Sequence, residues 1–382
     1  MVISNSFGGD ASGMVVENIA SALSKNHFVD VYTLKHNSLS KDFQGRIYQY
    51  AYPKIGVPFL KYLSLSVRLF GKDILSNYVI SSILCDIKGR QYDIILSFVY
   101  GLFCIGALAG NAVKRSNKIP HFSYFIDPIP APEGWLKVNS FYKRFKKYVV
   151  DFSKDIDSIA LSNSRMVEYQ KKIIYDKDIS VLYTPTSCSN LLNIARIKDS
   201  TVRFLYAGSI YGARTPQFLL KAFERLIDVG INAELLFVGT NDLCEYTRYL
   251  ADNVKERVKI FPRTNDLIQY YEISDVLIDI DADIANDVYL SSKVVNYLAI
   301  NRPIICQTRE GSPSDNLFKQ YNTIIQARFS VDSMCESMKR SIRYKDMFNY
   351  NERIELLKNF DINTIVRQLE AKLELMVRNN GK

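Results

Sequence analysis

Short apolar runs alternate along the chain with stretches in which apolar residues recur every three or four positions. The short runs are typical of parallel strands buried on both faces, and the longer spacing is typical of helices that cover them. The alternation predicts an α/β protein with two tandem Rossmann-like, doubly wound domains. The predicted strands are Val2–Ser6, Val29–Thr33, Ile94–Phe98, His121–Ile126, Ser158–Leu161 and Ser180–Tyr183 in the first half, and Arg203–Ala207, Glu234–Val238, Val258–Phe261, Asp275–Ile280 and Pro303–Cys306 in the second.

The helix after the strand Arg203–Ala207 has the clearest start. Thr215 is a suitable N-cap, Pro216 suits the first helical position, and Gly230 suits the end. The polar stretch 187–200 separates the two halves, so we predict domains at residues 1–188 and 189–360. Residues 361–382 form a C-terminal helix that can pack back on the first domain.

The 382 residues are 47% hydrophobic, which is enough to build two cores. The net charge is +9, and residues 1–190 carry most of it, with 23 Lys and Arg against 15 Asp and Glu. This excess favours an anionic partner such as a phospholipid surface or a phosphorylated acceptor. Charge alone also permits nucleic acid, but no nucleic-acid-binding motif is present, so none is expected as a partner.

The six cysteines are scattered without a CxxC pair, which favours a reducing compartment over a disulfide framework or a zinc site. Met1 leads directly into a predicted strand, with no secretory signal, so we expect a cytoplasmic protein, although the abrupt start leaves room for a longer native N-terminus. The longest apolar stretch, Ile94 to Ala109, is short for a membrane span and is interpreted as a buried strand followed by a buried helix.

The loop after the strand Arg203–Ala207 is the first candidate site. Gly208 and Ser209 stand where ligands bind in doubly wound sheets, beyond the carboxyl end of a strand. A glycine there lets a diphosphate approach the backbone, and Arg214 can add a charge-assisted hydrogen bond. A tight strand-to-helix turn with a solvated arginine is the alternative.

A second segment, Asp275 to Thr308, strengthens the phosphate interpretation. Ser291 or Ser292 can cap a helix, and Lys293 stands in its first turn, where a cation is unfavourable unless it binds an anion. Arg214 and Lys293 would then serve one ligand.

These residues resemble a GT-B glycosyltransferase of the family 4 type, common in bacterial capsule and O-antigen synthesis. The resemblance implies two domains with a cleft between them and a nucleotide-sugar donor held mainly by the second. It implies transfer with retention to a glycan, without a metal or other cofactor. The donor-binding residues that it implies are Gly208, Ser209, Arg214, Ser291, Ser292, Lys293 and Asn296. It places the loop with Gly8, Gly9 and Gly13 beside the transferred sugar.

The match has departures. Ser291 stands where a related subgroup has proline, and Asn296 where it has the glutamate that holds the donor ribose hydroxyls. Val288 occupies the first of two glutamate positions common in the wider family. Asparagine is neutral and shorter, so the nucleotide could be held more weakly.

Four aspartates invite a metal interpretation: Asp279, Asp281, Asp283 and Asp287. An EF-hand loop would need glycine and glutamate where Ile284 and Leu290 stand, so that interpretation fails. Because arginine and lysine already supply positive charge, we expect a polar loop partly facing the donor and no metal.

In the first half, Asp127 follows a strand's carboxyl end and is a candidate to orient an acceptor hydroxyl, to act as a base, or only to cap a turn. His121 begins the same strand and is interpreted as structural. In retaining enzymes of this family the resemblance implies that stabilising the departing diphosphate matters most, so we expect Arg214, Lys293 and Asp127 to be the catalytic residues.

Two basic, aromatic segments, 54–72 and 139–152, suit an anionic membrane surface, or are ordinary amphipathic helices with solvated basic faces. A lipid-linked acceptor on the inner face of the plasma membrane would explain both segments. The alternatives for the whole chain are a nucleotide-sugar 2-epimerase-like GT-B enzyme and a non-catalytic GT-B partner subunit. A dinucleotide dehydrogenase is disfavoured because the first glycine loop has the wrong spacing.

Overall fold

The structure is a computed structural model of the chain. It describes residues 1–38, 42–53, 58–186, 192–197, 199–240, 243–264 and 266–380. The chain divides into an N-terminal unit, residues 1–185 with 361–382, and a C-terminal unit, residues 186–360. The domain boundary predicted at residues 188 and 189 and the first part of the basic segment, residues 54–57, lie outside the described residues.

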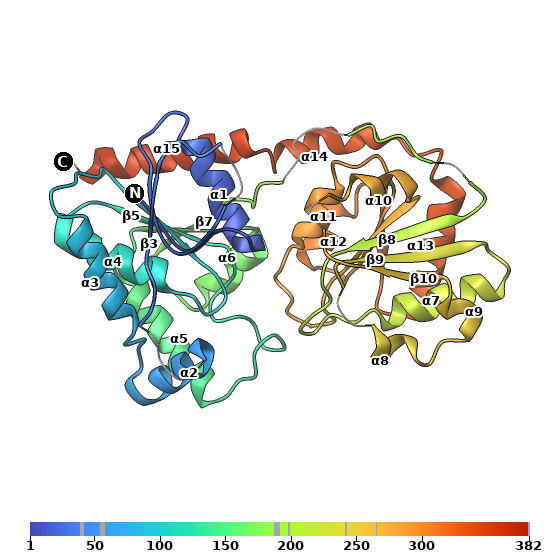
Figure 1. Cartoon of the computed structure of the whole chain (residues 1–382), viewed down its shortest axis with the longest axis horizontal. Helices are drawn as coiled ribbons and strands as arrows, with labels where there is room; N and C mark the ends of the chain where they lie inside the picture. The colour runs from blue at the N-terminus through green and yellow to red at the C-terminus, as the bar shows by residue number, and fades with distance from the viewer. Residues whose placement is uncertain are drawn as a thin grey trace. The chain divides into compact units, whose positions relative to one another are not determined.

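The N-terminal unit is built on a parallel sheet of seven strands in the order β3-β2-β1-β4-β5-β6-β7 (Figure 1). Its strands are β1 (Val2–Gly8), β2 (Asp30–Asn37), β3 (Arg46–Gln49), β4 (Ile95–Val99), β5 (His121–Phe125), β6 (Ser158–Leu161) and β7 (Asp178–Val181). Its helices are α1 (Ala11–Leu23), α2 (Phe59–Phe70), α3 (Ser76–Asp86), α4 (Ile105–Asn117), α5 (Ser140–Ser153), α6 (Ser164–Lys171) and α15 (Ile362–Asn380).

The C-terminal unit has a parallel sheet of six strands in the order β10-β9-β8-β11-β12-β13. Its strands are β8 (Val202–Ala207), β9 (Ala233–Val238), β10 (Val258–Phe261), β11 (Val276–Ile280), β12 (Ile304–Gln307) and β13 (Ile324–Ala327). Its helices are α7 (Gln217–Asp228), α8 (Cys244–Thr247), α9 (Asp252–Lys255), α10 (Ile268–Ile273), α11 (Ser292–Tyr297), α12 (Pro313–Phe318), α13 (Val331–Tyr344), η1 (Tyr350–Arg353) and α14 (Ile354–Lys358).

The predicted fold class is confirmed, because both units are α/β and both sheets reverse their strand order at an interior pair. Each predicted strand has its counterpart within a few residues. The strands β3 and β13 were not predicted, and both lie at the edge of a sheet. Strand β3 is largely uncovered, so its hydrophobic signal is weak, whereas β13 is mostly buried but only four residues long.

The C-terminal helix α15 belongs to the N-terminal unit and lies along α1 (Figure 1). Its buried residues Ile365, Val366 and Leu369 join the core that β1 and α1 form. At its surface, Glu370 contacts the ring of His27 at 2.9 Å. The chain therefore crosses to the C-terminal unit and returns to complete the first core.

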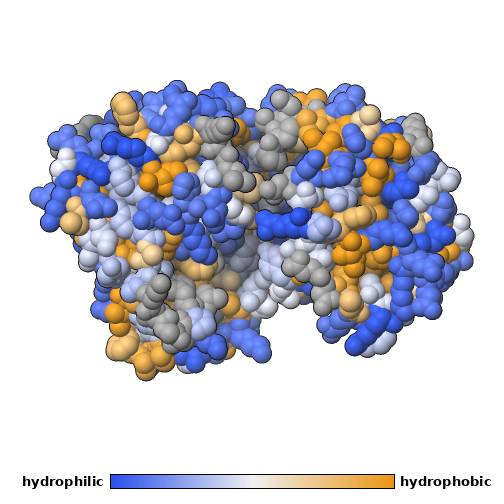
Figure 2. All heavy atoms as spheres, in the orientation of Figure 1, coloured by the Kyte–Doolittle hydropathy of each residue, from blue (hydrophilic) through white to orange (hydrophobic). Residues whose placement is uncertain are grey.

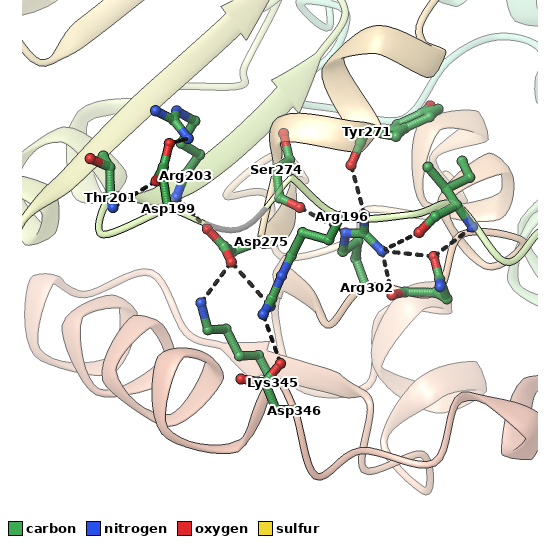
Figure 3. A network of polar contacts seen from close by, with 12 residues as sticks. Arg196, Asp199, Thr201, Arg203, Tyr271, Ser274, Asp275, Arg302, Lys345 and Asp346 are labelled. Atoms are coloured by element: carbon green, nitrogen blue, oxygen red, sulfur yellow. Dashed lines mark hydrogen bonds and ion pairs between the residues drawn. The ribbon is translucent and has the colours of Figure 1, made fainter.

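The C-terminal unit is fastened at the amino ends of its strands by a polar network (Figure 3). The buried carboxylate of Asp275 accepts from Lys345 Nζ at 2.6 Å and from the Arg203 backbone N–H at 2.9 Å, and it pairs with Arg196 at 3.1 Å. The Arg302 guanidinium donates to the carbonyls of Ser274 and Tyr271. This network lies at the amino ends of β8 and β11, and the candidate site lies at the carboxyl ends of the same strands.

Candidate donor-binding site

The candidate site lies where β8 and β11 end, the point at which the strand order of the C-terminal sheet reverses. After β8, Gly208 has φ +136°, a backbone conformation that residues with a side chain avoid. Its N–H donates to the Val238 carbonyl at 2.7 Å, and its carbonyl accepts from Thr240 Oγ1 at 2.7 Å. Ser209 is exposed, and its Oγ donates to the Gly239 carbonyl at 3.2 Å. The loop after β8 is thereby held by the loop after β9.

Lys293 lies directly against Gly208. A Cβ atom placed on Gly208 would come within 2.2 Å of Lys293 Cε, so a larger residue would displace the end of this lysine. Lys293 Nζ also stands 5.5 Å from the centre of the Tyr206 ring, which suits a cation–π contact. Burial lowers the pKa of Lys293. The two sequence signals, the glycine loop and the Ser-Lys pair, thus meet at one place.

Helix α11, which carries Lys293, is held at both ends. Of the two serines predicted as caps, Ser291 caps the helix, because its Oγ accepts from the Lys293 N–H at 3.3 Å, while Ser292 is exposed in the first turn. Ser291 Oγ also donates to Asp279 Oδ1 at 2.8 Å. At the other end, the Tyr297 hydroxyl accepts from the Ala207 N–H at 2.8 Å, next to Gly208.

Arg214 is 8% exposed and lies in the turn between β8 and α7. Its guanidinium stands 5.2 Å from the centre of the Tyr211 ring. Burial acts to lower the pKa of Arg214, but the neighbouring Tyr211, Asp279 and Asp281 outweigh it, so the net shift is upward and the guanidinium stays charged. Helix α7 begins at Gln217, one residue later than predicted, and Thr215 Oγ1 accepts from the Gln217 N–H at 3.2 Å.

Beside these two cations lie three of the four aspartates, and all three are buried. Asp279, Asp281 and Asp287 are 1%, 2% and 5% exposed. Asp281 Oδ2 accepts from Thr308 Oγ1 at 2.7 Å. Only Asp283 faces solvent, paired with Arg309 at 2.7 Å. Within the described residues, no group of three His, Cys, Asp or Glu side chains has the arrangement of a metal site.

Asn296 has a partner from the start of the C-terminal unit. Its Oδ1 accepts from Thr186 Oγ1 at 3.1 Å. No local sequence pattern predicts this contact, because Thr186 lies 110 residues earlier in the chain. The side chain of Asn296 is therefore held in place by Thr186, the first residue of the C-terminal unit.

In the N-terminal unit, the loop after β1 is shaped by the chain itself. A Cβ atom on Gly13 would stand 2.3 Å from the Gly8 carbonyl, and one on Gly9 would stand 2.7 Å from Asn37 Cβ. Asp10 caps α1, with its carboxylate accepting from the Gly13 N–H at 2.7 Å. Close packing thus accounts for these glycines without a ligand.

The two candidates on β5 lie at opposite ends of that strand. Asp127 follows the carboxyl end and is half-buried. His121 is fully buried at the other end, where its ring contacts Ser97 Oγ at 2.7 Å and Asn111 Oδ1 at 2.9 Å. Burial lowers the pKa of His121 to about 3, as expected for a structural histidine that stays neutral.

The basic segments form neighbouring helices α2 and α5 in the N-terminal unit. Helix α5 buries Phe145, Tyr148, Val149 and Phe152 and exposes Lys143, Arg144, Lys146 and Lys147. Helix α2 exposes Leu65, Leu69 and Phe70, each by more than half. Figure 2 shows apolar atoms gathered at the end of this unit where Figure 1 places α2. Among the described residues, no helix is both long and apolar enough to span a bilayer.

Comparisons with known proteins agree with this geometry. Residues 201–343 match the family model "Glycosyl transferases group 1". Among solved structures, the chain is similar to the lipopolysaccharide outer core galactosyltransferase WaaB, with 14% identity, 97% of both chains covered and a TM-score of 0.67. It is also similar to Anabaena Alr3699/HepE in complex with UDP-glucose, with 11% identity, 98% of this chain and 99% of that one covered and a TM-score of 0.68.

A third similar structure is the sucrose-phosphate synthase of Thermosynechococcus elongatus, with 11% identity, 99% of both chains covered and a TM-score of 0.69. No curated protein matches by sequence. The sheet orders and the structural similarity show a GT-B-like fold. The predicted GT-B-like fold is confirmed, and residues 201–343 of the C-terminal unit match the glycosyl transferases group 1 family model.

Proposed function

We propose that this protein transfers a sugar from a nucleotide-sugar donor, held by the C-terminal unit, to a glycan acceptor held by the N-terminal unit. The observation that carries the proposal is the contact of Lys293 with Gly208 beside the buried Arg214. Two cations at a glycine loop, at the point where the strand order reverses, suit a diphosphate. The UDP-glucose bound by HepE, a structure of the same fold, supports a nucleotide sugar as the donor.

In this mechanism the chemistry is mainly electrostatic. As the bond from the sugar to the diphosphate breaks, negative charge grows on the leaving phosphate. Arg214 and Lys293 stabilise that charge from fixed positions, since Tyr211 and Tyr206 flank them. Asp127 orients the acceptor hydroxyl, and retention follows from the family resemblance. No metal is required, because the two side chains supply the positive charge.

We further propose that the acceptor is lipid-linked and that the protein binds the inner face of the plasma membrane in capsule or O-antigen synthesis. The apolar side chains of α2 and the basic face of the neighbouring α5 support this proposal. Apolar residues that enter the interface and lysines that attract anionic headgroups act together at such surfaces.

The donor is tested by thermal unfolding of the purified protein with UDP-, GDP- and ADP-sugars. A ligand that binds the folded state raises the melting temperature. One class of sugar nucleotide should stabilise the wild type and not Arg214→Ala. Arg248→Ala is the matched control, because Arg248 also stands over a tyrosine, 4.5 Å from the Tyr249 ring centre, but lies at the C-cap of α8. Equal stabilisation of the wild type and Arg214→Ala would reject the proposed site.

The membrane is tested by sedimentation with vesicles of neutral or anionic phospholipid. Wild type should bind the anionic vesicles, and changing Lys143, Lys146 and Lys147 to glutamine should weaken binding severalfold. The control changes three exposed cations of the C-terminal unit, Lys259, Lys339 and Arg340, in the same way. Equal loss in both variants would show a nonspecific charge effect and contradict the proposed surface.

A further inference from the structure

A carboxylate pair lies behind the two cations of the proposed donor site. Asp279 and Asp281 are two residues apart on one face at the end of β11, and both are buried. Asp279 Oδ1 accepts from Ser291, which caps the helix that carries Lys293. Asp281 Oδ2 accepts from Thr308. Among the described residues, Asp281 Oδ1 has no hydrogen-bond partner.

A buried carboxylate oxygen without a partner is costly when it is charged, and it is much less costly on a neutral acid. Two carboxylates in one buried place also disfavour double ionisation. Burial, followed by the charges of Asp279 and Asp287, raises the pKa of Asp281 to about 7, against the opposing effects of Thr308 and Arg214.

The other groups that interact with the pair come from every neighbouring element. They are Tyr206 on β8, Arg214 before α7, Asp287 before α11, Lys293 and Tyr297 on α11, and Cys306 on β12. Burial raises the pKa values of Tyr206, Tyr297 and Cys306, so these groups stay neutral near pH 7. Lys293, whose pKa burial lowers, is the other group that could exchange a proton there.

We propose that the Asp279–Asp281 pair takes up one proton when a sugar nucleotide's diphosphate binds to Arg214 and Lys293. Ionised, the pair competes with the diphosphate for the same two cations. The two negative charges of the bound diphosphate make it still less favourable for Asp279 and Asp281 both to be ionised. Asp281 therefore holds a proton in the bound state. Donor affinity therefore falls as the pH rises above neutrality. Asp281 is a positioning residue, since it acts through the cations and not on the sugar. The inference rests on the proposed function.

The test is titration calorimetry of the protein with the sugar nucleotide that stabilises it in the thermal-unfolding panel. The diphosphate of an intact sugar nucleotide does not itself titrate near neutrality. Titrations in two buffers of different ionisation enthalpy, at about pH 8, give the number of protons taken up. Wild type should take up close to one proton, and its affinity should fall by up to about tenfold per pH unit above neutrality. Asp281→Asn should bind with no proton uptake and with little dependence on pH.

Thr308→Val is the second variant. It removes a hydrogen bond that favours the ionised acid, so its loss of affinity should begin at a higher pH. Wild-type binding without proton uptake would overturn the inference while leaving the donor site intact. Proton uptake that persists in Asp281→Asn would assign the proton to Lys293 and would also overturn the inference. No binding by wild type would reject the proposed function itself.

Discussion

Replacement of Gly208 by alanine perturbs the contact on which the donor site depends. At φ +136°, any residue with a Cβ atom is strained by about 1–3 kcal/mol. The new Cβ would also stand 2.2 Å from Lys293 Cε and 3.0 Å from Lys293 Cδ. Lysine is flexible and can move aside, so the protein should fold. Its ammonium group would then leave the place where the diphosphate is expected.

The expected losses are separable. Strain alone should lower the melting temperature of the C-terminal unit by roughly 2–10 °C. Loss of one charge-assisted bond to the diphosphate is worth about 1.5–3 kcal/mol, so donor affinity should fall about 10- to 150-fold. Unfolding followed by circular dichroism measures the first effect, and calorimetry with the donor sugar nucleotide measures the second.

Gly230→Ala is the matched control. Gly230 has φ +84°, but a Cβ atom there meets nothing within 4 Å. This variant should lose stability and keep wild-type donor affinity. If Gly208→Ala binds the donor as tightly as Gly230→Ala does, the placement of Lys293 against Gly208 has no part in binding, and the reasoning is refuted.

Three further results are expected. Burial holds the pKa of His121 at about 3, so its contribution to stability is full above about pH 6.5 and is lost as the pH falls toward 3, at about 1.4 kcal/mol per pH unit. His121→Gln should therefore make the free energy of unfolding in urea depend less on pH between pH 7 and 5. An unchanged pH dependence would show that this histidine is not its source. The fully buried Arg353 donates to carbonyls of Ile300, Arg302 and Thr323, so Arg353→Met should cost about 3–5 kcal/mol, whereas the exposed Arg340→Met should cost almost nothing in the same denaturant titration. Asn296→Glu should tighten donor binding severalfold in calorimetry, since a carboxylate accepts more strongly from ribose hydroxyls; weaker binding would contradict a ribose contact at this position.

Much of the fold could be predicted because parallel strands leave a strong trace. A central strand such as β11 is buried on both faces and appears as an apolar run that contains one acidic residue, Asp279. The edge strand β13 is only Ile324–Ala327 and pairs with one neighbour, so its four residues do not stand out. Local signals placed one helix start correctly, since Ser291 caps α11 as predicted, and missed the other by one residue, since Pro216 and not Thr215 is the N-cap of α7.

The candidate site was predicted in part, for the same reason. The glycine after β8 and the lysine in the first turn of α11 are short-range patterns, and the sheet order brings them together. The burial of Asp279 and Asp281 could not be read from an alternating acidic stretch that also suits a solvated loop. Likewise, the bond from Thr186 to Asn296 joins residues far apart in sequence, and only the folded unit brings them together.

The most direct measurement is a crystal structure of the protein with its sugar nucleotide bound, soaked at a pH below neutrality where donor affinity should be highest. The account predicts that phosphate oxygens lie within hydrogen-bond distance of the Arg214 guanidinium and Lys293 Nζ, against the backbone of Gly208. A diphosphate bound elsewhere on the chain, with Arg214 and Lys293 untouched, would contradict the central claim.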